Sequence, residues 1–187
     1  MSIKNDNDIE IRNKEKELRG LNFRSNISPA LREINTMMED DRGIYGPLNK
    51  LIEYKDEYAN AIMVAAGGRM NSVVVDTDFT AQKCIQALKS KKLGRLTFIP
   101  LNKIITPNDR QKAVELVSSH DAIDFVRNLI NYDSMFEKAI KYAFGDTILM
   151  DTIERARKHM TGVRIVTLDS FIFYFFFIHC GFLGKSR

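Results

Sequence analysis

Two observations predict a mixed α/β (α+β) fold of two similar subdomains, each with a small sheet and flanking helices. The first is a strand–helix–strand unit over residues 72–101, which opens with the β-branched run Val73-Val74-Val75, typical of a buried strand. The second is a similar unit over residues 145–168, where a glycine precedes an apolar strand and an aspartate. Repetition of one such unit within a chain indicates an internal duplication.

The first unit contains a predicted helix that includes Phe79 and has Lys89, Lys91 and Lys92 in its last turn. Asp76 and Asp78 offer short carboxylates that can cap its free N–H groups. Cations in its last turn suit the helix dipole, and Gly94 ends it. Residues 95–99 then alternate like a strand, which Pro100 closes. The apolar side of the helix is predicted to consist of Phe79, Ala81, Cys84, Ile85 and Leu88.

The second unit follows the same order with a shorter helix. Asp151 and Glu154 have the spacing of a capping box, and Gly162 ends the helix before a strand over residues 163–168. Its buried side is predicted to comprise Ile153, Ala156 and Met160. Each unit also follows a helix that runs into glycine. The apolar positions of these helices are Ala59, Ile62, Met63 and Ala66 before Gly67-Gly68, and Phe136, Ala139, Ile140 and Ala143 before Gly145.

The remaining segments give weaker signals. Residues 1–20 are polar with one apolar heptad, which fits either the end of a coiled coil or a solvated helix. Ser28-Pro29 predicts a helix start, and the glycines and proline of residues 43–48 predict a turn at a domain boundary. Residues 106–111 form a polar connector. The pattern leaves residues 113–117 undecided between helix and strand, and slightly favours helix over residues 122–131.

Residues 171–183 (FIFYFFFIHCGFL) differ in character from the rest of the chain. As a helix they would reach about 20 Å against a bilayer core of about 30 Å, so a membrane-spanning helix is disfavoured. Their aromatic residues make a poor helix and an aggregation-prone segment. A buried tail, a membrane-skimming tail and a sequence without a selected role all stay open.

Composition indicates an ordinary globular protein of 187 residues, with 44% hydrophobic and 28% charged residues. The net charge of +4 permits contact with nucleic acid but does not argue for it. Two cysteines make no disulfide framework, and the amino-terminal residues lack the apolar core of a signal peptide. We therefore expect a cytoplasmic protein.

The sequence offers no constellation that supports catalysis. Gly184-Lys185-Ser186 lacks the glycine five places earlier that a phosphate loop needs, so that interpretation is rejected. His120, His159 and His179 show no metal-ligand spacing, and Cys84 lies on an apolar helix face that favours inert packing. We expect no catalytic residue, metal or cofactor.

Cationic side chains cluster at corresponding helix ends of the two units. Such clusters can neutralise backbone phosphates without reading base sequence, or can simply be solvated helix ends that satisfy the dipole. The candidate DNA-contacting residues are Lys89, Lys91, Lys92 and Arg95 in the first unit, and Arg155, Arg157 and Lys158 in the second. The glycines assigned to structural turns are Gly43, Gly46, Gly67, Gly68, Gly94, Gly145 and Gly162.

These motifs resemble a known family. The segments GIYGPLNKLIEYKDEYANAIMVAAGGRMNSVVVDTDFTAQKCIQALKSKKLGRLTFIPLNKI and NYDSMFEKAIKYAFGDTILMDTIERARKHMTGVRIVTLD closely resemble the hinge of structural maintenance of chromosomes (SMC) proteins, of archaeal or bacterial type. The resemblance covers roughly residues 43–169. It implies a hinge of two similar subdomains that dimerises at the tip of two long coiled coils, whose far ends carry ATPase heads. It further implies a role in chromosome condensation and segregation, with DNA contacts at the hinge.

Two departures from the family change these expectations. The chain has no phosphate loop, no ATPase signature and no length for the coiled-coil arms, so ATP binding belongs to full-length family members alone. After Leu168-Asp169 the family continues into a glycine-rich segment of the dimer interface, whereas phenylalanines follow here. We therefore expect a gene fragment or a mis-joined reading frame, with weakened dimerisation.

The sequence thus predicts a non-enzymatic dimerisation module of the SMC-hinge type, associated with the chromosome. Its expected partners are a second hinge, as a homodimer, and DNA; no small-molecule substrate and no membrane are expected. The alternative is a small α/β nucleotide- or metabolite-binding enzyme domain with an unrecognised site, which would show a pocket lined by convergent polar groups. The predicted divisions are a helical stub (1–42), subdomain I (43–111), an incomplete subdomain II (112–170) and an apolar tail (171–187).

Overall fold

The computed structural model describes residues 28–106, 108–119, 121–159, 162–168 and 172–173. Its helices are α2 (Pro29–Asp40), α3 (Ala59–Ala66), α4 (Asp78–Ser90), α5 (Gln111–Ser118), α6 (Glu137–Phe144) and α7 (Ile153–His159). Its strands are β1 (Ile44–Pro47), β2 (Ile52–Tyr54), β3 (Val73–Val75), β4 (Phe98–Pro100), β5 (Asp124–Phe125), β6 (Ile130–Tyr132), β7 (Ile148–Met150), β8 (Ile165–Thr167) and β9 (Ile172–Phe173). Short 3-10 turns include η3 (Gly67–Asn71), η4 (Val126–Leu129) and η5 (Ser134–Phe136).

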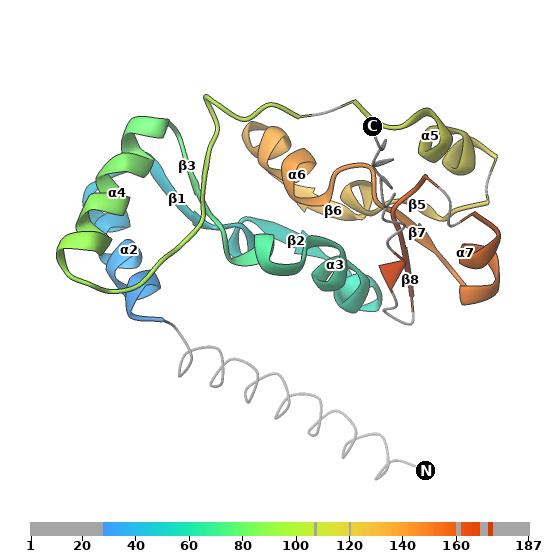
Figure 1. Cartoon of the computed structure of the whole chain (residues 1–187), viewed down its shortest axis with the longest axis horizontal. Coiled ribbons are helices and arrows are strands. Elements are labelled where there is room, and N and C mark those ends of the chain that lie inside the picture. Colours follow the sequence, from blue (N-terminus) through green and yellow to red (C-terminus); the bar gives the residue numbers. More distant parts are fainter. Residues whose placement is uncertain (1–27, 107, 120, 160–161, 169–171, 174–187) are drawn as a thin grey trace, which may run out of the picture.

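The strands form three sheets with a repeated connectivity. One sheet has the order β1-β3-β4, another the order β5-β7-β8-β9, and β2 pairs with β6 in a two-stranded ribbon. In each larger sheet the central strand is antiparallel to the strand before it and parallel to the strand that follows the crossover helix. The ribbon is antiparallel and joins the two halves at the middle of the molecule (Figure 1). The predicted fold class of two similar α/β subdomains is confirmed.

Each central strand is buried on both faces, as the apolar runs predict. Val73 and Val75 pack against α2 and α4 at one end of the molecule, whereas Val74 faces a central core. Ile148 and Met150 likewise pack against α5 and α7, whereas Leu149 faces the same central core. Because neighbouring strand residues point to opposite faces, each sheet separates an outer core from the shared one.

The shared core holds the two halves together. It contains α3 residues from the first half and α6 residues from the second, with Phe144 fully buried. The rings of Tyr45 and Phe136 meet edge to face across the halves, with 5.2 Å between centroids. Arg164, just before β8, donates a hydrogen bond to the carbonyl oxygen of Ala65 at the end of α3. Neither half has a complete core of its own.

Several predicted elements are confirmed. The strand over residues 73–75 is β3, and the helices ending at Gly67 and Gly145 are α3 and α6. Ser28 caps α2 by accepting a hydrogen bond from the Leu31 N–H at 3.2 Å. The undecided residues 113–117 are helical, within α5. The closing strands are shorter than predicted, since β4 begins only at Phe98 and β8 covers residues 165–167.

Two predictions of local structure are wrong. Residues 43–48, expected as a turn, contain strand β1, which tolerates its glycine and proline because it is an edge strand with a bulge between Ile44 and Gly46. Residues 122–131, whose pattern is ambiguous and slightly favours helix, form β5, the turn η4 and β6. Their apolar residues face two different cores, and this produces a spacing that resembles helical periodicity.

The helix caps differ by one residue from those predicted. Thr77 is the N-cap of α4 and accepts a hydrogen bond from the Thr80 N–H at 3.2 Å. Asp76 instead accepts from the Thr77 N–H at 2.5 Å. In the second half Thr152 accepts from the Arg155 N–H at 3.3 Å, in place of the predicted Asp151–Glu154 box. Threonine therefore caps both crossover helices.

Three side chains assigned to buried helix faces are exposed. Met63 lies on the outer side of α3, and Ile85 is partly exposed on α4. Phe79 is 65% exposed in the first turn of α4, and the Lys83 ammonium lies 5.5 Å from its ring centroid. Predictions for residues 1–27, for Met160 and for residues 174–187 lie outside the described residues.

We expect Phe144→Ala to lower the free energy of unfolding by about 3–5 kcal/mol, because this side chain fills the shared core. Chemical denaturation followed by circular dichroism measures this change. Phe79→Ala serves as the matched control, with a change of less than about 0.5 kcal/mol at an exposed site. Two separate unfolding transitions in the parent chain would contradict a core shared by both halves.

Candidate functional site

The basic cluster of the first half lies at the carboxyl end of α4. Lys89 is exposed in the last turn, and Lys91 forms a salt bridge of 2.7 Å with Glu33 on α2. Arg95 is exposed in the loop that leads to β4. Among the described residues, no salt bridge involves Lys89, Lys92 or Arg95, so these three cations face solvent without a carboxylate partner.

Lys92 has an unusual backbone conformation for a lysine. Its φ of 53° places it in the left-handed region, and among the described non-glycine residues it alone has a positive φ. The Leu93 N–H bonds to the Leu88 carbonyl at 3.1 Å and the Lys92 N–H to the Lys89 carbonyl at 3.2 Å, the two bonds of a Schellman motif. Glycine is the usual residue at this position, since a side chain there destabilises the fold by about 1 kcal/mol. The lysine is thus held at an unfavourable position.

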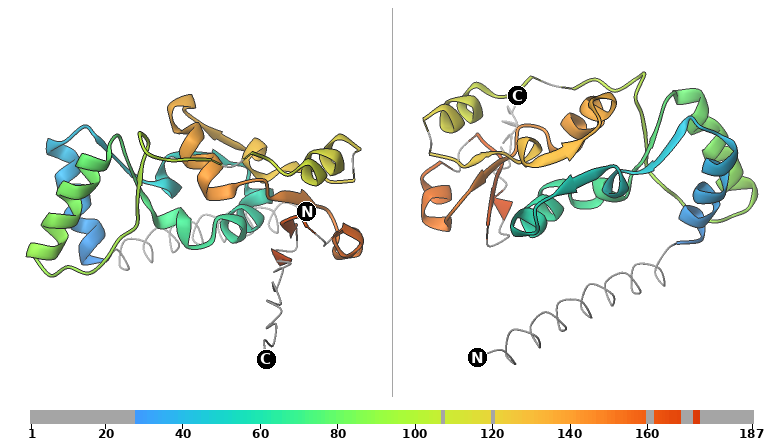
Figure 2. Two further views of the ribbon diagram at one scale, coloured as in Figure 1. Left: turned by 45° about the horizontal axis from the view of Figure 1, so that its top comes forward. Right: turned by 180° about the vertical axis from the view of Figure 1, so that it is seen from behind.

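The basic cluster of the second half lies on α7. Arg155 forms a salt bridge of 3.3 Å with Asp151, whereas Arg157 and Lys158 are exposed. With Glu154 they line a shallow hollow of about 330 Å³. In all three views α4 and α7 lie at opposite ends of the molecule (Figures 1 and 2). The two basic clusters of one chain therefore do not form a single continuous surface.

Two ion pairs that sequence reasoning missed fix the connector to the second half. Asp109 accepts two hydrogen bonds from the Arg127 guanidinium, at 2.9 and 2.7 Å. The Arg110 guanidinium donates two to Asp146, at 2.8 and 3.1 Å, and one to the Gly162 carbonyl at 3.1 Å, and the Arg110 backbone N–H donates a third to Asp146 at 3.1 Å. Sequence spacing gives no signal for these partners, because they come from separate turns.

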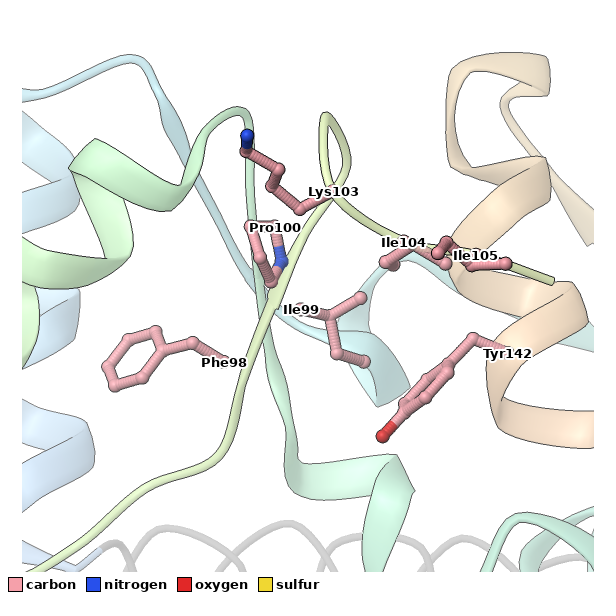
Figure 3. A pocket seen from close by; sticks show the side chains of 7 residues that line it. All are labelled: Phe98, Ile99, Pro100, Lys103, Ile104, Ile105 and Tyr142. Atoms are coloured by element: carbon pink, nitrogen blue, oxygen red, sulfur yellow. The ribbon is translucent and has the colours of Figure 1, made fainter.

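An apolar hollow lies between the two halves, beside the start of the connector (Figure 3). It has a volume of about 230 Å³ and is lined by Phe98, Ile99, Pro100, Lys103, Ile104, Ile105 and Tyr142. Ile105 is 90% exposed, which is unusual for so large an apolar side chain. The Lys103 ammonium points away from Tyr142, and Arg69 lies 5.8 Å from the centroid of the same tyrosine ring.

Strand β4 borders this hollow and forms one end of its sheet. The Thr97 carbonyl and the Leu101 N–H bond to β3, so the alternation along the strand directs the Phe98 N–H and carbonyl outward. Pro100 has no N–H, and its carbonyl accepts from the Lys103 N–H at 3.2 Å. The open edge therefore offers a single donor–acceptor pair, at Phe98.

The titratable groups of the described residues fit structural roles. The Gly43 N–H, together with the Lys83 ammonium at 3.3 Å, lowers the pKa of Asp41. A hydrogen bond from Asn102 lowers the pKa of Asp78, and burial raises the pKa of the Cys84 thiol. No three His, Cys, Asp or Glu side chains converge as metal ligands in this part of the chain.

The glycines assigned to turns differ in what the structure requires of them. Positive φ values occur at Gly46, Gly67, Gly94, Gly145 and Gly162. Gly67 and Gly145 end α3 and α6 with nearly identical geometry, at φ 55°, ψ −136° and φ 57°, ψ −137°. Gly43 has no room for a side chain, because a Cβ there would lie 2.7 Å from the Asp76 carboxylate. Gly68 meets no such constraint.

Comparison with known proteins identifies the class of this domain. Residues 41–160 match the model of the SMC proteins' flexible hinge domain. The chain is 47% identical over 128 residues to the chromosome partition protein Smc of Pyrococcus furiosus, and 37% identical over 143 residues to that of Aquifex aeolicus. These matches cover 68% and 75% of this chain but only 10% and 12% of the relatives, so the chain spans about a tenth of their length.

Solved structures agree with this class. The hinge domain of Geobacillus stearothermophilus SMC, crystallised as an asymmetric dimer, aligns with 87% of this chain and 67% of its own, at a TM-score of 0.75 and 27% identity. The Pyrococcus furiosus SMC hinge aligns with 78% of this chain and 82% of its own, at a TM-score of 0.61 and 35% identity. The chain belongs to the SMC hinge family.

We expect Gly43→Ala to lower the free energy of unfolding by about 1–3 kcal/mol, because the added methyl group must displace the Asp76 carboxylate. That carboxylate cannot move freely, since it accepts a hydrogen bond from the Thr77 N–H at 2.5 Å. Thermal unfolding measures the effect. Gly68→Ala is the control and should be neutral or stabilising by up to about 1 kcal/mol. Equal effects of the two substitutions would rule out the steric explanation.

Proposed function

We propose that this chain is a non-enzymatic dimerisation hinge that pairs with a second hinge, as part of a protein of chromosome condensation and segregation. Its subdomain divisions are taken as residues 43–111 and 112–170. Membership of the SMC hinge family supports the role in chromosome partition, which the names of the full-length relatives carry. A chromosome-associated cytoplasmic location follows from the same role.

The open edge of β4 carries the proposal of dimerisation. An unpaired strand edge with an apolar hollow beside it favours addition of a further strand, because backbone bonds and apolar burial are gained together. The exposure of Ile105 and the half-exposed Tyr142 adds apolar surface at this place. The Geobacillus hinge forms an asymmetric dimer in its crystal, which supports pairing of two hinges here without indicating which surface pairs.

Contact with DNA is the second part of the proposal, and Lys92 supports it best. Glycine at this position would stabilise the fold, so a lysine there is best explained by what its side chain binds. Lys89 and Arg95 add unpaired cations nearby, whereas Lys91 already binds Glu33. Such a cluster would neutralise phosphates of any base sequence. Arg157 and Lys158 would form a separate contact on α7, since the two clusters lie far apart.

A small enzyme domain finds no support in the family model, which is that of a hinge domain, or in the relatives and structures named above, which are chromosome partition proteins and SMC hinges. The hollow beside β4 is lined mainly by apolar side chains, which suits a packed partner better than a polar substrate. No described helix is long and apolar enough to cross a membrane.

We expect Ile105→Lys to raise the dissociation constant of the dimer at least about tenfold, because a charge would be buried against the apolar hollow. Analytical ultracentrifugation over a concentration series measures this constant. Phe79→Lys introduces the same charge at another exposed apolar site on α4 and should leave it unchanged. An unaltered dimer in Ile105→Lys would place the interface elsewhere.

For DNA we expect Lys92→Gly to change affinity and stability in opposite directions. The affinity for DNA duplexes of unrelated sequences should fall by the same factor for each duplex. The slope of log affinity against log salt concentration should decrease in magnitude by about 1. The free energy of unfolding should rise by about 0.5–1 kcal/mol, because glycine suits the left-handed conformation. Lys138→Gln, at an exposed position of α6, is the charge control. If the variant is more stable but binds DNA as the parent chain does, Lys92 does not contact DNA.

A further inference from the structure

We propose that two ion pairs hold Ile105 beside Tyr142 and so shape the surface that binds a second hinge. The pairs are Asp109 with Arg127 and Arg110 with Asp146. None of these four charged residues would touch the partner, so they are positioning residues. Their effect on dimerisation rests on the proposed function, whereas the attachment that they provide within the chain does not.

The described residues between β4 and α5 form a link, residues 101–106 and 108–110, whose start is attached to the first half. The Leu101 N–H bonds to the Val75 carbonyl at 2.9 Å. The Asn102 amide exchanges two hydrogen bonds with Asp78, at 3.0 and 2.8 Å. Within the described part of the chain, no backbone hydrogen bond joins residues 104–106 to either half. The positions of these three residues therefore depend on side-chain packing and on the attachment at the far end of the link.

Burial of its own side chain does not hold Ile105 in place. Ile104 packs against the shared core, but Ile105 is 90% exposed. An apolar side chain that stays in water gains no hydrophobic stabilisation from its position. The backbone must hold it there, and Asn102 secures the link only on the side that precedes Ile105.

The far end of the link is attached to the second half by the two ion pairs. Asp109 accepts hydrogen bonds of 2.9 and 2.7 Å from the Arg127 guanidinium, and these side chains are only 22% and 15% exposed. Arg127 also donates to the Gly145 carbonyl at 2.7 Å and lies 4.1 Å from the ring centroid of Phe125. Bidentate pairs sheltered in this way are screened little by water and salt. Arg127 is therefore a fixed point for the link.

Both ion pairs end on the chain that directly follows α6. Gly145, which binds Arg127, is the C-cap of α6, and Asp146 is the next residue. Tyr142 lies in the last turn of the same helix and lines the hollow together with Ile105 (Figure 3). The ion pairs thus fix the link relative to the helix that carries Tyr142.

This attachment matters for binding because the apolar surface combines two parts of the chain. Ile105 belongs to the link and Tyr142 to α6, so movement of the link would separate them. A loop that is already fixed in its binding position loses less entropy when a partner docks. Release of the link should therefore weaken dimerisation even though no contact residue has changed.

The first test measures the attachment itself, in the full chain with Asp109→Asn and Asp146→Asn combined. An amide presents N–H groups to the guanidinium in place of one carboxylate oxygen, so both bidentate pairs are lost. Trypsin cleavage after Lys103 reports release of the link, and cleavage after Lys141 inside α6 reports global unfolding. At protein concentrations that keep the chain monomeric, the ratio of the first rate to the second should rise about tenfold. Asp41→Asn with Asp151→Asn removes two other ion-paired carboxylates and should leave the ratio unchanged.

The second test measures the dissociation constant of the dimer by analytical ultracentrifugation. The Asp109→Asn, Asp146→Asn variant should raise it about tenfold, because binding must then also order the link. Either substitution alone should leave it close to that of the parent chain, because the remaining ion pair still holds the link. Added to Ile105→Lys, the two substitutions should cause no further loss, since they act through Ile105. A general loss of structure would add to the effect of Ile105→Lys.

The outcomes separate this proposal from the proposed function. An unchanged cleavage ratio overturns the attachment. A raised ratio with an unchanged dissociation constant, in a chain whose dimer Ile105→Lys weakens, overturns the positioning role and leaves the proposed function intact. Effects that add to those of Ile105→Lys also overturn it. If Ile105→Lys itself leaves the dimer unaltered, the proposed dimerisation surface is wrong, and a raised cleavage ratio then supports the attachment of the link alone.

Discussion

The core shared by the two halves is the constraint on which the rest of the structure depends. Val74 and Leu149 must each be covered on the face that their own crossover helices leave open, and a single core built from residues of both halves provides that cover. The β2–β6 ribbon has three residue pairs, too few to be stable in water without this support. The salt bridges of Asp109 and Arg110 then fix how the connector enters the second half.

Sequence reasoning found the elements whose signal is local. A continuous β-branched run predicted β3, and glycines at the helix ends predicted where α3 and α6 stop. It failed where one segment serves two cores: residues 122–131 alternate between them within a few positions, and their pattern resembles a helix. Strand β1 was hidden by its glycine and proline, which an edge position allows.

The candidate site was likewise only partly predictable from the sequence. The cationic ends of α4 and α7 are visible in the sequence, since lysine and arginine cluster there. The sequence does not show which of these cations lack a carboxylate partner, because Glu33, the partner of Lys91, lies far from it along the chain. The hollow was also beyond prediction, as it combines β4 with Tyr142 of the other half. The left-handed conformation of Lys92 has no signature in composition, because glycine is the residue that normally marks it.

The two crossover helices are unequal, with 13 residues in α4 and 7 described residues in α7. A duplicated domain with identical halves would look the same after a half-turn about the ribbon, so a neighbour could approach it in two equivalent orientations. The extra turns of α4 remove that equivalence and give the molecule a direction. Any assembly that contacts an end of this domain can therefore distinguish one end from the other by the length of its crossover helix.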